Sequence, residues 1–140
     1  MVDFRFYHPV EVRYGDLDPQ GHVNNASYLT YMEQGRVAYI RQLGLWQGGS
    51  FLDFGLILAD VHVSFRSPIL FGDLVQVGVR VSRLGGKSLN MEYSLEHPHS
   101  GSQYARGTSI MVAYDYHNLH SVPLPEHWRE VIVTFEGLKG

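Results

Sequence analysis

The stretch that decides the fold is "RYGDLDPQGHVNNASYLTYMEQGR", residues 13–36. It begins as the end of an alternating, strand-like segment, turns through Pro19 and Gly21, and continues as a long helical segment. Asp-Pro-x-Gly is sound turn chemistry, and Asn24 or Asn25 suits a helix N-cap. The turn holds more polar groups than a change of direction requires, which makes it a candidate site as well.

The helical segment carries one apolar face. At about 100° per residue, the side chains that share this face are Tyr28, Leu29, Met32, Gly35, Tyr39, Ile40 and Leu43. Gly35 lacks a side chain, so we expect the helix to approach its neighbour closely there. Gly44 is placed to end the helix as a C′ glycine.

Strand-like segments flank the helix. Residues 4–14 alternate polar and apolar with Pro9 inside, which indicates an edge strand or a bulge. Downstream, period-2 patterns predict strands at 57–65, 75–81 and 89–95, and the doubly apolar 104–116 indicates a central strand. Near the end, "PLPEHWREV" predicts a short helical turn before "VIVTF".

These elements predict an α+β fold in which an antiparallel β-sheet curls around one long central α-helix, because a single amphipathic helix must bury its apolar face. With 140 residues, of which 44% are hydrophobic and 18% charged, the chain has the composition of one globular domain. We therefore assign residues 1–140 to one domain.

Composition also excludes several functions. The net charge of −3 and the absence of a basic run argue against nucleic acid as a partner. The chain has no cysteine, so it has neither a thiol nucleophile nor a disulfide. The N-terminus is unlike a signal peptide, and no apolar run approaches the roughly 20 residues that span a bilayer, so we expect a cytoplasmic protein that does not enter membranes.

Two carboxylates lie close together in the turn. If strand geometry persists through it, Asp16 and Asp18 point the same way and need a donor or a cation nearby. Arg36 lies in the middle of the apolar helix face, where an unpaired guanidinium is costly. Glu33, three residues earlier, is its favoured partner and Asp16 the alternative.

The start of the helix offers chemistry as well. Backbone N–H groups of the first helical turn are unpaired and together carry about half a positive charge. Such a donor can stabilise an oxyanion, which is worth about 3 kcal/mol in a transition state. A carboxylate held a few residues earlier could then attack a carbonyl or activate water against it.

The run D-x-D-x-x-G-H-V-N-N-x-x-Y, with "FRSPILFGD" and "RLGGKSLNMEY" downstream, resembles the hotdog-fold acyl-CoA thioesterases of the 4-hydroxybenzoyl-CoA thioesterase family. The resemblance extends from about Glu11 to Tyr116. It implies that Asp18 is the catalytic carboxylate and that the amide of Asn25 forms the oxyanion hole. We place four supporting residues around them: Asp16, His22, Asn24 and Glu33.

The resemblance also implies how substrate is bound. Relatives bind the nucleotide phosphates of CoA in the region where this chain has Arg83, Lys87 and Ser88, and Arg66 is a second candidate. It implies a homodimer, often joined into a homotetramer, with active sites at subunit interfaces. We expect no cofactor and no metal. The valine-rich strand 75–81 is our candidate for an edge that needs a partner.

Several alternatives remain open at this level. Asp18 could be a nucleophile or a general base, and the carrier could be CoA or an acyl-carrier protein. A hydratase or dehydratase acting on acyl thioesters, with His22 beside Asp18, and a non-catalytic acyl-CoA-binding module are the competing functions. Histidines that gather in the last third raise a metal site as a weaker alternative: His97, His99, His117, His120 and His127.

Overall fold

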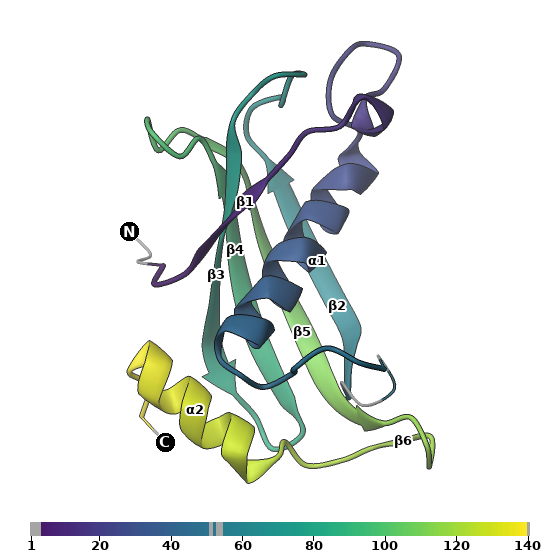
Figure 1. Ribbon diagram of the computed structural model, residues 1–140, viewed down its shortest axis with the longest axis vertical. Coiled ribbons are helices and arrows are strands. Elements are labelled where there is room, and N and C mark those ends of the chain that lie inside the picture. Colours follow the sequence, from purple (N-terminus) through teal and green to yellow (C-terminus); the bar gives the residue numbers. More distant parts are fainter. Residues whose placement is uncertain (1–3, 51, 53–54, 140) are drawn as a thin grey trace.

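The computed structural model describes residues 4–50, 52 and 55–139 (Figure 1). In chain order its elements are β1 (Tyr7–Val10), a 3-10 turn (Tyr14–Asp16), α1 (Asn25–Gln42), β2 (Leu56–Phe65), β3 (Val75–Leu84), β4 (Ser88–Glu96), β5 (Gln103–Asp115), β6 (His120–Ser121) and α2 (Glu126–Glu136). The strands form one antiparallel sheet in the order β1-β3-β4-β5-β2, with β6 paired to β5. Helix α1 lies across one face of this sheet, as predicted (Figure 1).

Helix α1 packs closely on the middle of the sheet. A Cβ atom at Gly35 would lie 2.8 Å from Val77 Cγ1 and 3.0 Å from Val79 Cγ2, so only glycine fits this contact. The buried face of α1 is rotated about the helix axis relative to the predicted apolar face. Leu29 is 41% exposed, whereas Tyr31 is 1% exposed, because the hydroxyl of Tyr31 finds an acceptor inside.

The two edges of the sheet are unlike each other. β1 is a four-residue edge strand that contains Pro9, which confirms the edge predicted from that proline. β2 is a ten-residue edge strand whose residues are mostly exposed. The prediction that strand 75–81 is an edge was wrong, because β3 pairs with β1 on one side and β4 on the other.

The C-terminal segment forms a longer helix than predicted. α2 runs for 11 residues and includes all of "VIVTF". Ile132 is buried, and the carboxylate of Glu136 accepts hydrogen bonds from the hydroxyl of Tyr39 (2.7 Å) and the amide of Val81 (2.9 Å). These contacts with α1 and β3 hold the helix at the end of the sheet where β3 terminates (Figure 1).

Candidate active site

The first carboxylate of the turn, Asp16, is hydrogen-bonded to α1 through one of its oxygens. Its Oδ2 accepts hydrogen bonds from the amide of Arg13 (2.9 Å) and the hydroxyl of Tyr31 (2.6 Å). Its backbone carbonyl accepts from the amide of Asn24 (2.7 Å). Burial raises the pKa of Tyr31 and the bond to Asp16 raises it further, so the phenol keeps its proton. Asp16 therefore ties the turn to α1 at two points.

Arg36 has other partners. Its Nη2 lies 3.6 Å from Oε2 of Glu33, and its Nη1 donates to the hydroxyl of Tyr93 (3.2 Å). The predicted pair with Glu33 is confirmed, and the alternative pair with Asp16 is wrong. Tyr31 supplies the donor that Asp16 requires, so no cation is needed there.

The second carboxylate, Asp18, is held differently. Its Oδ1 accepts from the amides of Gln20 (2.9 Å) and His22 (3.1 Å), which orients the side chain within its own loop. Its Oδ2 makes no hydrogen bond within the described residues. The expectation that Asp16 and Asp18 share one side of a strand was wrong. β1 ends before the turn and residues 14–16 form a 3-10 turn, so the two acids meet different partners.

The start of α1 is capped as predicted. Oδ1 of Asn24 accepts from the amide of Ala26 (2.8 Å), and its carbonyl accepts from the amide of Ser27 (2.9 Å). Asn25 is the first residue of the helix. Its amide has no acceptor among the described residues, so it is a free donor at the positive end of the helix dipole.

Asp18 and Asn25 line one cavity of about 350 Å³. Asp18, His22 and Asn25 line it from the turn and the helix start, and Arg66 lines it from the segment after β2. Four of the predicted site residues are thus brought together, although Arg66 is 48 positions from Asp18 in the chain. The remaining lining residues are Gln20, Val23, Tyr28, Phe65, Ser67 and Pro68.

Tyr28 belongs to this cavity but was not among the predicted site residues. Its ring packs edge-on against Phe65, with centroids 4.9 Å apart, and its hydroxyl lies 3.5 Å from the carbonyl of Ser67. Burial raises the pKa of the Tyr28 hydroxyl and the nearby Asp18 carboxylate raises it further, against a lowering by the backbone of Ile69. The hydroxyl therefore stays protonated in the cavity that Asp18 also lines.

Other predicted residues lie away from this cavity. Glu33 is eight residues along α1 from Asn25, about 12 Å, and lines other cavities. Arg83, Lys87 and Ser88 belong to the β3–β4 hairpin. In the strand register, the hairpin lies at the part of β5 that also pairs with the start of β2. The Asp18 cavity lies beyond the other end of β2. The hairpin and the cavity are therefore about 30 Å apart along the strand.

The hairpin contributes to a second, basic cavity of about 570 Å³. Arg129 of α2 and Lys139 line it together with Arg83, and none of its described lining residues is acidic. Arg129 also donates to the carbonyl of Gly85 (2.8 Å), which fixes α2 against the hairpin. No spacing signal in the sequence pointed to Arg129 or Lys139, because both are far from the hairpin along the chain.

Comparison with known proteins identifies the fold and the family. A thioesterase from Thermus thermophilus, crystallised with coenzyme A and Zn, is 38% identical and covers 99% of this chain and 100% of its own, with a TM-score of 0.84. A predicted thioesterase from Bacillus stearothermophilus, 21% identical, shares the fold with a TM-score of 0.85 over 96% of this chain and 98% of its own. The predicted hotdog fold is confirmed.

The family model of the thioesterase-like superfamily matches residues 12–132, and the chain belongs to that superfamily. The putative acyl-CoA thioesterase YneP of Bacillus subtilis is 25% identical over 93% of this chain and 94% of its own length. The acyl-CoA thioesterase YbgC of Haemophilus influenzae is 26% identical over 99% of this chain and 100% of its own. These names bear out the predicted enzyme class, a thioester hydrolase.

Two further properties of the described chain concern metals and membranes. Residues 4–50, 52 and 55–139 contain no group of three or more His, Cys, Asp or Glu side chains arranged to hold a metal ion. Within the same residues, no helix has both the length and the apolar character needed to cross a membrane.

Proposed function

We propose that this protein hydrolyses the thioester bond of an acyl-CoA or acyl-carrier substrate, with Asp18 as the acting carboxylate and the amide of Asn25 as oxyanion donor. One observation carries the proposal: Asp18, whose Oδ2 has no donor among the described residues, and Asn25, whose amide has no acceptor among them, line the same cavity. Asp16, Asn24 and His22 support them, since the first two fix the turn on α1 and the amide of His22 orients Asp18.

Two routes use this arrangement. As general base, Asp18 takes a proton from water, the resulting hydroxide attacks the thioester carbon, and the thiolate leaves and is then protonated. As nucleophile, Asp18 attacks the carbon and expels the thiolate, and water cleaves the mixed anhydride to regenerate the carboxylate. In both, negative charge develops on the carbonyl oxygen, where the Asn25 amide stabilises it.

The leaving group explains why one carboxylate and one amide donor suffice for the reaction. A thiol is far more acidic than an alcohol or an amine, so the thiolate departs without a strong general acid. Tyr28 lines the same cavity as Asp18, and burial keeps its hydroxyl protonated and able to donate. We place it as an orienting group for the substrate carbonyl.

Binding of CoA calls for cations at its phosphates. Arg66 is in the Asp18 cavity, whereas Arg83, Lys87 and Ser88 are at the opposite end of the same sheet. We propose that two copies pair antiparallel along β2, a long edge with exposed apolar side chains at Ile57, Leu58 and Phe65. Antiparallel pairing lays the hairpin end of one copy beside the Asp18 end of the other, which would give interfacial active sites.

The decisive experiment compares wild type with Asp18→Asn. The amide keeps an oxygen for the Gln20 and His22 donors but cannot serve as base or nucleophile. We expect thiol release from a panel of acyl-CoA and acyl-carrier thioesters to fall by about 10²–10⁴-fold, while the unfolding midpoint and the binding of a non-hydrolysable acyl-CoA thioether stay close to wild type. Equal rates in the two proteins would remove Asp18 from the mechanism.

The same panel separates the competing functions. Loss of enoyl absorbance without release of thiol would indicate hydration. Tight binding of acyl-CoA by wild type without turnover of any panel member would indicate a binding module.

A further inference from the structure

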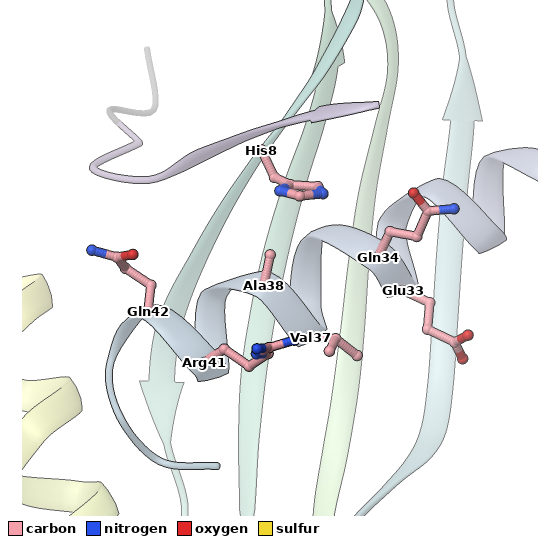
Figure 2. A pocket seen from close by; sticks show the side chains of 7 residues that line it. All are labelled: His8, Glu33, Gln34, Val37, Ala38, Arg41 and Gln42. Carbon is pink, nitrogen blue, oxygen red and sulfur yellow. The ribbon is translucent and has the colours of Figure 1, made fainter. Parts of the chain in front are cut away.

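A second cavity of about 350 Å³ lies between the middle of α1 and the start of β2, and its described lining residues are all different from those of the Asp18 cavity. α1 contributes Glu33, Arg36 and Val37 to it. Figure 2 shows Glu33 and Val37 on the side of α1 away from β1. The remaining lining residues are mostly apolar: Leu56, Ile57, Leu58, Met111 and Tyr116.

Arg36 is the buried charge of this cavity, with only 7% of the residue exposed. Its Nη1 donates to the hydroxyl of Tyr93 (3.2 Å), whereas its Nη2 makes no hydrogen bond within the described residues and lies 3.6 Å from Oε2 of Glu33. The side chain of Glu33 is 66% exposed, so water screens this ion pair and weakens it. The guanidinium therefore keeps donors that a ligand in the cavity can use.

A carboxylate is the ligand group that satisfies these donors best. Its two oxygens match the fork of the guanidinium, and the apolar walls strengthen the pair because they keep the local dielectric constant low. Glu33, being exposed, can turn into water and leave its place to the ligand. A methyl group at the same place would leave the guanidinium of Arg36 buried without a new partner, which is costly.

The proposed pairing of two copies along β2 brings this cavity next to the reaction site. Full overlap of the two ten-residue antiparallel strands places Leu56 opposite the partner's Phe65. Phe65 lines the Asp18 cavity, and Leu56 lines the cavity of Arg36. An acyl chain whose thioester lies at Asp18 of one copy would therefore extend toward Arg36 of the other copy.

We propose that this cavity binds the far end of the acyl group and that Arg36 selects acyl groups that end in a carboxylate. The preferred substrates are then monothioesters of dicarboxylic acids. The assignment rests on the proposed function, because it adds a specificity to the same reaction. Arg36 is a specificity-determining residue: it contacts the distal carboxylate, while the thioester carbonyl stays at Asp18 and Asn25.

Substrate preference tests this assignment in the wild-type protein. Thiol release is measured for CoA monothioesters of dicarboxylic acids of increasing chain length and for fatty acyl-CoAs of equal carbon number. At the best-fitting length, kcat/KM should favour the carboxylated series by about 10–100-fold. The dissociation constants of non-hydrolysable thioether analogues should show the same preference, and their measurement requires no turnover.

Four variants sharpen the test, with the ratio of kcat/KM between the two series as the readout. Arg36→Met removes the guanidinium but keeps a long side chain, and Tyr93 retains its 2.7 Å hydrogen bond with Ser109; the preference should fall by about 10–100-fold. Arg36→Lys keeps the charge without the fork and should retain part of it. Glu33→Gln removes the competing carboxylate and should raise it about two- to fivefold. Arg41→Met, at an exposed position outside this cavity, should leave the ratio unaltered.

The assignment is rejected if wild type does not prefer the carboxylated series, or if Arg36→Met keeps the wild-type ratio. Should Arg36→Met fail to fold, Arg36→Lys and the wild-type comparison decide the question. Failure of the proposed function would give a different result: no thiol would be released from either series. The thioether dissociation constants would still report whether Arg36 binds the distal carboxylate.

Discussion

Two segments of one turn, residues 13–17 and 18–23, each hold an aspartate, and different parts of the chain supply their hydrogen-bond donors. Oδ2 of Asp16 receives both the Arg13 amide and the buried Tyr31 hydroxyl. Oδ1 of Asp18 receives the amides of Gln20 and His22 from its own loop. In each acid the other carboxylate oxygen has no donor among the described residues. Asp18 lines the cavity that Asn25 also lines, and Asp16 is not among the residues that line it, so Asp18 is the acid placed to meet a substrate.

The contrast shows why two acids occupy this turn. Asp16 links the turn to α1 through Tyr31 and through the amide of Asn24. That link sets where the helix begins relative to the loop, and so sets the Asn25 amide against Asp18. The first acid builds the geometry that the second acid is proposed to use.

The strongest test of this comparison is a double-mutant cycle on the hydrogen-bonded pair Asp16 and Tyr31. Asp16→Ala leaves the buried Tyr31 hydroxyl without its acceptor and should lower the free energy of unfolding by about 1–3 kcal/mol. Tyr31→Phe should cost less, about 0.5–1.5 kcal/mol, because no buried hydroxyl remains. Urea unfolding of all four proteins should give a double variant less destabilised than the sum of the singles. Strict additivity would mean that the two residues act separately.

A smaller effect is expected at the helix cap. Asn24→Ala removes the acceptor of the Ala26 amide and should lower the free energy of unfolding by about 1 kcal/mol. Turnover should fall as well, because the neighbouring Asn25 amide loses its fixed position. Asn24→Ser is the matched control, since serine also caps, and should retain most of both properties. Full activity in the alanine variant would show that the cap does not position the oxyanion donor.

The smallest effect on stability is expected at Tyr28, which lines the same cavity as Asp18. Its bond to the Ser67 carbonyl is long, at 3.5 Å, so Tyr28→Phe should change the free energy of unfolding by less than about 0.5 kcal/mol. The pKa of Tyr28 is raised above its ordinary value of 10.0, mainly by burial. The hydroxyl is therefore protonated throughout the neutral range, and the two pH–rate profiles should keep the same shape there. A lost ionisation in the variant would contradict this assignment.

The predictions from sequence succeeded where the determining interactions are local. The Asn24 cap and the C-terminal Gly44, which has a φ of +73°, depend on hydrogen bonds within one helical turn and were both predicted. Leu29 was wrongly placed in the core, because periodicity gives the existence of an apolar face but not its exact rotation. Tyr31 occupies that place instead, and the acceptor that makes this possible is 15 residues away.

The site residues show the same difference between local and long-range interactions. Asp18 and Asn25 were predicted because turn, cap and helix start are contiguous in the chain. Tyr28, one helical turn after Asn25, could have been suspected from that spacing. Ser67 could not, since it reaches the cavity only through the pairing of β2 with β5 and the return of the chain toward α1.

The sequence alone determined that a strand-like segment turns into a capped helix and that several β-strands follow, because hydrophobic period, turn residues and capping act over a few positions. Tertiary structure decided which acid is bonded to α1 and which lines the cavity, that β2 rather than β3 lies at an exposed edge, and which cations share a cavity with Asp18. Those outcomes depend on hydrogen bonds and packing between residues tens of positions apart, for which a local pattern holds no information.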